Sequence, residues 1–256
     1  MQTIIQNKLR DIQQQEQVRI LFAVESGSRA WGFPSPDSDH DVRFVYVRPQ
    51  EAYLRLNPPR DVIEWQLDEV LDINGWDLAK ALRLLRKSNP TLLEWCHSPI
   101  VYFSHPLFEE FRQLAERCFL SKPGLRHYLH MAQTNNREYL RAEQVPLKKY
   151  LYVLRPLLAC RWILTQRTLP PMLFSELTAA CLDEAMKPTV ENLLEQKIRT
   201  PEVKTGPRIE MLNRFIEAEL PRLESQIDAL PPEDPCDWQL LNALFLRLLD
   251  EIWCKE

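Results

Sequence analysis

The loop between two predicted strands near the N-terminus constrains this chain more than any other feature. Residues 18–24 (VRILFAV) form a short apolar run, and residues 41–47 (DVRFVYV) alternate between apolar and polar side chains before Pro49. Both patterns predict strands, and these strands bracket the segment ESGSRAWGFPSPDSDH. An apolar strand, a Gly-Ser pair, an Asp-x-Asp pair and a second strand thus follow one another closely.

Gly27, Ser28, Asp39 and Asp41 carry the chemistry of this loop. Gly27 and Ser28 predict a sharp turn whose amides and hydroxyl can approach phosphate oxygens, because glycine has no obstructing side chain. Asp39 and Asp41 flank His40, so a strand that begins here directs both carboxylates to one face. Mg²⁺ prefers carboxylate ligands and shares its coordination with phosphates. We therefore expect a cation and phosphate site, and the alternative is an ordinary surface turn, which uses the same residue types.

A metal site that activates a hydroxyl also needs a third carboxylate, supplied by a neighbouring strand. Asp72 is the best candidate because it lies in a further strand-like run, residues 70–74 (VLDIN). Asp68 falls in the predicted turn before that run, and Asp77 is better explained as the N-cap of the next helix. The alternative for Asp72 is a solvated strand residue, so the choice among the three stays open at this point.

The remaining pattern predicts two domains. Residues 3–16 have the spacing of an amphipathic helix, and residues 61–67 and 70–74 predict two strands joined by a tight turn. We expect an α/β (α+β) domain with a mixed, partly antiparallel sheet over residues 1–105, followed by an all-α domain over residues 106–256. The later helices are expected at residues 107–118, 125–143, 146–165, 174–181, 189–197, 209–226 and 238–253.

Composition narrows the class of protein. Hydrophobic residues make up 45% and charged residues 27% of the 256 residues, which is typical of a soluble globular protein. The formal net charge of −4 disfavours a whole-protein electrostatic grip on nucleic acid, although a local basic cleft stays open. No run approaches the roughly 20 apolar residues that span a bilayer, so we expect a cytoplasmic protein without a membrane partner.

The six cysteines are spread along the chain without the two-residue spacing of zinc sites or redox motifs. A disulfide framework suits short secreted chains better than a chain of this length. We therefore expect reduced, structural cysteines.

The run GSRAWGFPSPDSDHDVRFVYV resembles the signature of the DNA polymerase beta nucleotidyltransferase superfamily. With DINGWDLAKALRLLRKSNPTLLEWCHSPIVY and LKKYLYVLRPLLACRWI, the chain is more similar still to the RNA-repair-associated polymerase-beta-like family RlaP. The resemblance implies that Gly27 and Ser28 hold a triphosphate. It also implies that Asp39 and Asp41 bind metal, with Asp72 as the third acid and third ligand.

One predicted helix adds a basic and aromatic stripe. Lys148, Tyr152 and Arg155 lie at positions i, i+4 and i+7 and share one face. The helical domains of similar enzymes provide lysine and tyrosine groups to a nucleoside triphosphate, which implies that this stripe binds a nucleotide. The alternative is a solvated face with a snorkelling lysine, and Lys149 is the substitute if the helix is rotated.

Four more residues of the loop and the following strand are candidates for the site. Arg29 can reach phosphate from the loop, and Arg43 alternates with Asp41 and can lie at the same face. Trp31 and Phe33 can stack on a base, although packing that anchors the loop is the more common role of such residues.

The resemblance implies a metal-dependent nucleotidyltransferase with its active cleft between the two domains. Mg²⁺ is the expected cofactor, with Mn²⁺ as an alternative, and a nucleoside triphosphate is the expected donor. The acceptor is a hydroxyl, for which an RNA end and a protein side chain are both candidates. The rivals are a protein-nucleotidylating enzyme, a catalytically silent module that senses a nucleotide, and a helical interaction protein that binds no triphosphate.

Overall fold

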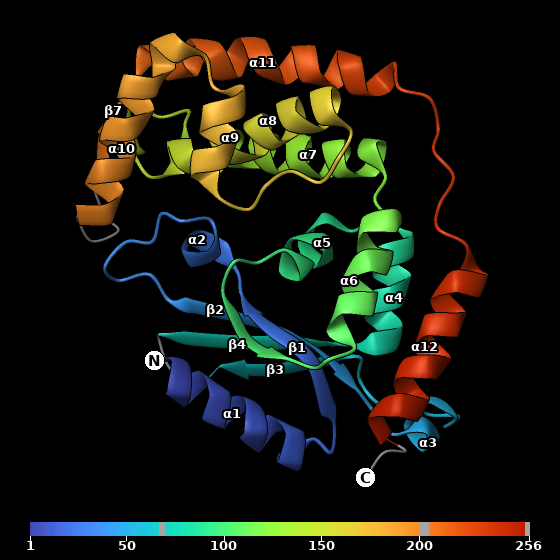
Figure 1. Ribbon diagram of the computed structural model, residues 1–256. Coiled ribbons are helices and arrows are strands. Elements are labelled where there is room, and N and C mark those ends of the chain that lie inside the picture. The colour runs from blue at the N-terminus through green and yellow to red at the C-terminus, as the bar shows by residue number, and fades with distance from the viewer. Residues whose placement is uncertain (67–69, 200–204, 254–256) are drawn as a thin grey trace. The chain divides into compact units, whose positions relative to one another are not determined.

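The computed structural model describes residues 1–66, 70–199 and 205–253 (Figure 1). Contacts between residues divide the chain into two compact units. The first unit comprises Met1–Ala30, Asp39–Phe119 and Pro235–Glu256, and the second comprises Trp31–Ser38 and Leu120–Asp234.

The first unit is built on a five-stranded sheet with the strand order β3-β4-β2-β1-β5. Its strands are β1 (Arg19–Glu25), β2 (His40–Val47), β3 (Val62–Gln66), β4 (Leu71–Asp77) and β5 (Val101–Ser104). The strands β2 and β4 pair in parallel, whereas the other neighbours pair antiparallel. The mixed, partly antiparallel sheet expected from the sequence is confirmed.

Helices cover both faces of this sheet (Figure 1). The helix α1 (Gln2–Gln15) buries Ile5, Leu9 and Ile12 against a core that includes residues of β1, β2 and β4. On the other face, α4 (Leu78–Arg86) packs on β2 and β4, and the carboxylate of Asp77 caps it by accepting the Ala79 N–H at 2.8 Å. The other helices of this unit are α2 (Gly27–Ala30), α3 (Gln50–Tyr53), α5 (Pro90–Cys96), α6 (Phe108–Arg117) and α12 (Trp238–Trp253).

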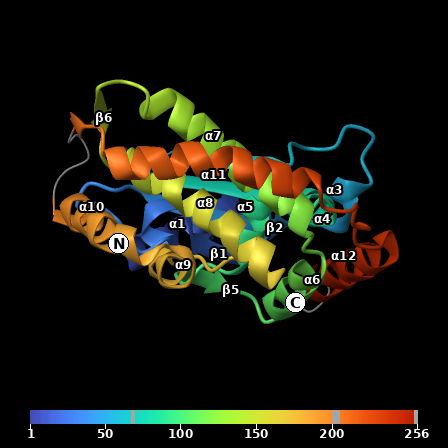
Figure 2. The same ribbon diagram turned by 90° about the horizontal axis from the view of Figure 1, so that it is seen from above.

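The second unit is helical. Its elements are α7 (Ser121–Tyr139), α8 (Lys149–Gln166), α9 (Phe174–Cys181), the 3₁₀ turn η1 (Glu184–Met186), α10 (Lys187–Arg199) and α11 (Glu210–Asp228), with the short strands β6 (Gln144–Pro146) and β7 (Thr205–Pro207). The helices α7 and α8 form its main pair, and α11 lies across both, as Figure 2 shows. In the part of the chain that the structure describes, no helix is long and apolar enough to cross a membrane.

The division into units differs from the boundary expected near residue 105. The helix α6 and the C-terminal helix α12 both belong to the first unit, where α12 packs against α4 and β2. Helical periodicity identifies such segments as helices with an apolar stripe, but it does not say which partner buries the stripe.

Cys118 and Cys236 form a disulfide within the first unit, with their Cα atoms 5.1 Å apart. The expectation that all cysteines are reduced is therefore wrong for this pair. The two residues are 118 positions apart, and they meet because the segment that leads into α12 returns to the end of α6. No local spacing in the sequence reports such a return.

We expect two fewer thiols to react in denatured, unreduced protein than after reduction. The measurement is a thiol titration under both conditions, and peptide mapping without reductant is expected to find Cys118 linked to Cys236. The variant Cys96→Ser serves as control, because Cys96 is a free cysteine and its removal leaves the difference between the two conditions unchanged. Equal titres before and after reduction contradict the pairing.

Candidate active site

The Gly-Ser pair and the Asp-x-Asp pair meet at one end of the β1–β2 pair. Gly27 begins the one-turn helix α2 with a φ of +61°, a backbone conformation that favours glycine. A Cβ atom on Gly27 would fall on Oδ2 of Asp41. The Ser26 N–H also donates to the Asp41 carbonyl at 2.8 Å. The predicted turn is thus a helical turn, and its backbone lies directly against one of the predicted metal ligands.

Asp41 and Asp72 lie opposite each other in the parallel register of β2 and β4. Arg43 bridges them, because its Nη2 donates to Oδ1 of Asp41 at 2.8 Å and to Oδ2 of Asp72 at 2.7 Å. Of the three candidates for the third acid, Asp72 is thus next to Asp41. Asp77 caps α4 and also accepts from the Tyr53 hydroxyl at 2.9 Å, whereas Asp68 lies outside the described residues.

The carboxylates of this cluster lie close enough to repel one another, and the pKa of Asp41 reflects this. Burial raises the pKa of Asp41 above its ordinary value, while Arg43 opposes the rise. The negative charges of Asp39, Glu25 and Asp72 raise that pKa further. Ionisation of Asp41 is therefore unfavourable in this site. A cation bound here would reduce the repulsion between Asp41 and the neighbouring carboxylates.

Glu25 lies in this cluster but is not among the site residues predicted from the sequence. Its carboxylate is fully buried at the end of β1, where Oε1 accepts the backbone N–H of Asp41 at 2.6 Å. Its Oε2 lies 3.0 Å from Nδ1 of His40 and accepts a hydrogen bond from the Tyr102 hydroxyl. Burial and the contact with Glu25 raise the pKa of Tyr102. The signal in the sequence was a glutamate at the end of an apolar strand, two residues before Gly27.

The loop between Gly27 and Asp39 is tied at both ends. Ser28 is buried, and Arg29 donates from Nε to the Asp39 carbonyl at 2.9 Å, so Arg29 spans the base of the loop. The Asp39 residue itself is exposed. Phosphate binding by Ser28 and Arg29 stays a prediction.

Lys148, Tyr152 and Arg155 belong to the second unit, and so does the loop segment that carries Trp31 and Phe33. Arg155 is only 1% exposed, with its guanidinium carbon 4.4 Å from the centre of the Trp31 ring. The Tyr152 ring lies 5.8 Å from Trp31 and 6.2 Å from Phe33. Packing of Trp31 and Phe33 in this cluster anchors the loop, and nucleotide binding by Lys148, Tyr152 and Arg155 stays a prediction.

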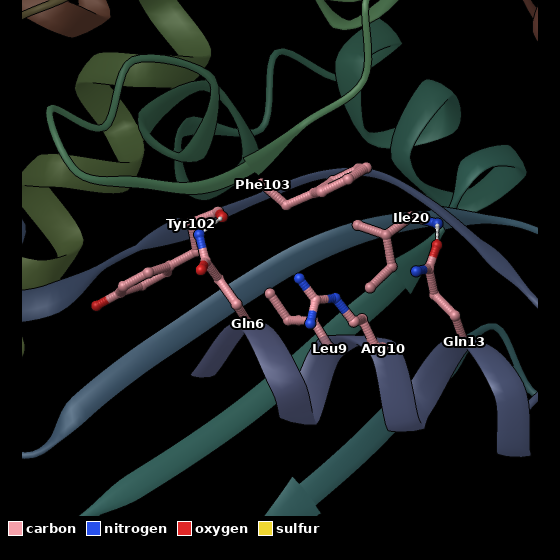
Figure 3. Close-up of a pocket in the computed structure, with 7 residues that line it drawn as sticks. All are labelled: Gln6, Leu9, Arg10, Gln13, Ile20, Tyr102 and Phe103. Carbon is pink, nitrogen blue, oxygen red and sulfur yellow. Dashed lines mark hydrogen bonds between the residues drawn. The ribbon is translucent and has the colours of Figure 1, made fainter. Parts of the chain in front are cut away.

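A separate cavity of about 220 Å³ lies beside α1 (Figure 3). It is lined by Gln6, Leu9, Arg10, Gln13, Ile20, Tyr102 and Phe103, none of which is a predicted site residue. Two polar side chains here already serve the fold, since Gln6 donates to the Tyr102 carbonyl at 3.1 Å and Gln13 accepts the Ile20 N–H at 2.8 Å.

The residues of the cluster fit a hard divalent cation in the chemistry of their donors. Asp39, Asp41 and Asp72 offer only carboxylate oxygens, and the missing Cβ of Gly27 leaves space beside Oδ2 of Asp41. Within the described ranges, no three acidic, histidine or cysteine side chains already form a metal cage, and Arg43 holds one oxygen of Asp41 and one of Asp72.

A known protein family matches nearly all of this chain. The family described as RNA repair pathway DNA polymerase beta family, RlaP, matches residues 1–247. The uncharacterized protein YcgL of Bacillus subtilis strain 168 is 45% identical over 249 residues, which cover 96% of each chain. The uncharacterized protein MJ0002 of Methanocaldococcus jannaschii is 29% identical over 106 residues, which cover 40% of this chain and 43% of that one.

Among solved structures, a nucleotidyltransferase-like protein from Exiguobacterium sibiricum 255-15 is similar over 98% of this chain and 80% of its own. At 16% identity and a TM-score of 0.31, that likeness is too low to bear on the fold. The family match is different in kind, because it extends over nearly the whole sequence and includes the Gly27 turn, Asp39, Asp41 and Asp72. The chain therefore belongs to RlaP, a family of polymerase beta-like nucleotidyltransferases.

Proposed function

We propose that this protein is a Mg²⁺-dependent enzyme that transfers a nucleoside monophosphate from a nucleoside triphosphate to a hydroxyl and releases pyrophosphate. The observation that carries the proposal is the acidic cluster on neighbouring strands, with Asp41 opposite Asp72 and against the Gly27 turn. Family membership supports the reaction class. The words RNA repair in the family's description favour an RNA end as the acceptor.

Each residue of the cluster has a proposed task. Asp39 and Asp41 would hold Mg²⁺, which when bound neutralises phosphate charge and stabilises the leaving group. Gly27 and Ser28 would bind the triphosphate through the turn. The acceptor oxygen then forms a bond to the α-phosphorus, and the bond from that phosphorus to the pyrophosphate oxygen breaks. Asp72 accepts the proton of the acceptor hydroxyl, since its side chain is 48% exposed and Arg43 engages only its Oδ2.

The test is to incubate the protein with each α-labelled nucleoside triphosphate, Mg²⁺ and pooled RNA. Label is expected on RNA, together with an equal amount of pyrophosphate, and chelation of the metal is expected to stop both. The double variant Asp39→Ala, Asp41→Ala is expected to lose the activity. The variant Asp37→Ala is the matched control, because it removes an exposed acid of the same loop outside the cluster. Equal turnover by wild type and the double variant overturns the mechanism.

The variant Asp41→Asn separates loss of function from loss of fold. The folded-state pKa of Asp41 is raised above its unfolded value, mainly by burial, so protonation favours the folded state. That contribution is complete below the unfolded pKa and is lost as the pH rises through the folded pKa. At pH 7 the asparagine side chain is uncharged, so the variant lacks the unfavourable free energy of burying an ionised carboxylate. We therefore expect Asp41→Asn to abolish transfer while raising the thermal midpoint of the metal-free protein, and a lowered midpoint contradicts this.

Protein nucleotidylation is the second candidate, since the same donor site serves a tyrosine, serine or threonine hydroxyl. Label that appears on protein rather than on RNA in the same assay selects it. Tight triphosphate binding by calorimetry without pyrophosphate release instead selects a nucleotide-sensing module.

A further inference from the structure

Arg43 occupies the space between the two facing carboxylates of the site. It lies two residues after Asp41 on β2, so both side chains project from the same face of the sheet. Its Nη2 binds Asp41 and Asp72, while its Nη1 donates to the Asp72 carbonyl at 2.9 Å and to the Val42 carbonyl at 3.1 Å. Its side chain is only 17% exposed. Four acceptors therefore hold this guanidinium in one place.

The position of this charge matters for any metal at the site. Asp41 and Asp72 are paired in the register of β2 and β4, so their carboxylates lie close together. Two such negative charges repel each other, and a cation between them reduces that repulsion. The planar guanidinium already supplies that cation, in charge-assisted hydrogen bonds. A divalent ion that used the same two oxygens would have to displace Arg43 and then lie beside its positive charge.

We propose that Arg43 is a permanent part of the site and takes the place of a second divalent ion. Metal is then bound by Asp39 and Asp41 alone, and Asp72 is not a ligand but an acid that Arg43 positions. This inference rests on the proposed metal-dependent function, and it narrows the three-carboxylate ligand set expected from the sequence. Arg43 is a positioning residue here, because it contacts the two acids and not the reacting atoms.

The test measures metal binding rather than turnover. Mn²⁺ is titrated into the full-length protein without nucleotide, and binding is followed by water proton relaxation and by the electron paramagnetic resonance of free Mn²⁺. Wild type is expected to bind one ion. Asp41→Asn is expected to weaken binding about tenfold or more through loss of a ligand, whereas Asp72→Asn changes it by no more than about threefold, since only a neighbouring charge is lost.

The variant Arg43→Gln is expected to change Mn²⁺ affinity in the opposite direction. Removal of the positive charge is expected to tighten Mn²⁺ binding about fivefold or more, because a like charge next to the ion has gone. In that background Asp72 becomes available as a ligand, so adding Asp72→Asn is expected to weaken binding by a similar factor. Arg43→Lys keeps the positive charge but cannot make all four hydrogen bonds of the guanidinium, so it is expected to tighten Mn²⁺ binding less than Arg43→Gln does.

Several results overturn the proposal. If Asp72→Asn weakens Mn²⁺ binding as much as Asp41→Asn in the wild-type background, Asp72 is a ligand and Arg43 moves aside. Two bound ions in wild type, or an unchanged affinity in Arg43→Gln, have the same consequence. If Arg43→Gln does not fold, the comparison of Asp72→Asn with Asp41→Asn still decides. The expected metal pattern without nucleotidyl transfer rejects the proposed function and leaves the role of Arg43 standing.

Discussion

Replacing Gly27 by alanine is expected to lower nucleotidyl transfer at least about 100-fold, because the new methyl group displaces Asp41, a proposed metal ligand. The Cβ atom would fall on Oδ2 of Asp41, which is the free end of a side chain and can swing away. The fold therefore survives the change, but the carboxylate does not stay where the site needs it. The positive φ of Gly27 adds a strain of about 1–2 kcal/mol.

The matched control for this variant is Gly32→Ala. Gly32 also has a positive φ, of +84°, but a Cβ there would meet Leu173 rather than an acid of the site. Both variants are expected to lose a similar amount of unfolding free energy in urea titrations, and only Gly27→Ala is expected to lose Mn²⁺ affinity and turnover together. Full turnover by Gly27→Ala shows that the turn does not set the position of Asp41.

Replacing Glu25 by alanine is expected to lower the free energy of unfolding by about 3 kcal/mol, because it leaves one buried and one partly buried donor without their acceptor. These donors are the backbone N–H of Asp41 and the hydroxyl of Tyr102, and both bind the fully buried carboxylate. Released from Glu25, the first residues of β2 lose the bond that holds the Asp-x-Asp pair in register. Turnover is therefore expected to fall as well, more than stability alone accounts for.

The variant Glu25→Gln tests whether Glu25 acts as a hydrogen-bond acceptor for β2. Its amide oxygen can still accept the Asp41 N–H, so most of the stability lost in Glu25→Ala is expected to return. Tyr102→Phe removes one donor together with the need to satisfy it, and its cost is expected to be smaller than that of Glu25→Ala. Unfolding followed by far-ultraviolet circular dichroism gives the comparison. A loss below about 1 kcal/mol in Glu25→Ala contradicts a role for this carboxylate in holding β2.

Much of the fold was predictable because its elements have strong local signals. The apolar run before Gly27 and the alternation after Asp41 identify β1 and β2, and Asp77 caps α4 as expected. The strand β5 was not predicted, because three of its four residues are exposed and its proline-flanked sequence lacks a clear alternation. The assignment of α6 and α12 to the first unit was not predictable either, since an apolar stripe does not identify its partner.

The candidate site was likewise predictable only where it depends on local sequence. Asp39 and Asp41 were predicted together because a strand places every second side chain on one face, but β2 begins at His40, so only Asp41 lies within it. Asp72 could only be ranked above Asp68 and Asp77, because the pairing of β2 with β4 sets which acid lies opposite Asp41. The place of Arg155 against Trp31 depends on the packing of distant segments, and helical spacing reports only which side chains share a face.

By itself, the sequence determined the Gly-Ser turn, the strand β2 that carries Asp41 and the class of fold, since each depends on residues within one or two neighbouring elements. Only the tertiary structure decided that Glu25 holds the backbone of Asp41, that Arg43 lies between Asp41 and Asp72, and that Cys118 meets Cys236. The physical reason is that hydrogen bonds, ion pairs and disulfides join atoms that the folded chain brings together across long sequence separations. Periodicity encodes which face a residue occupies, and the register of the sheet decides what it faces.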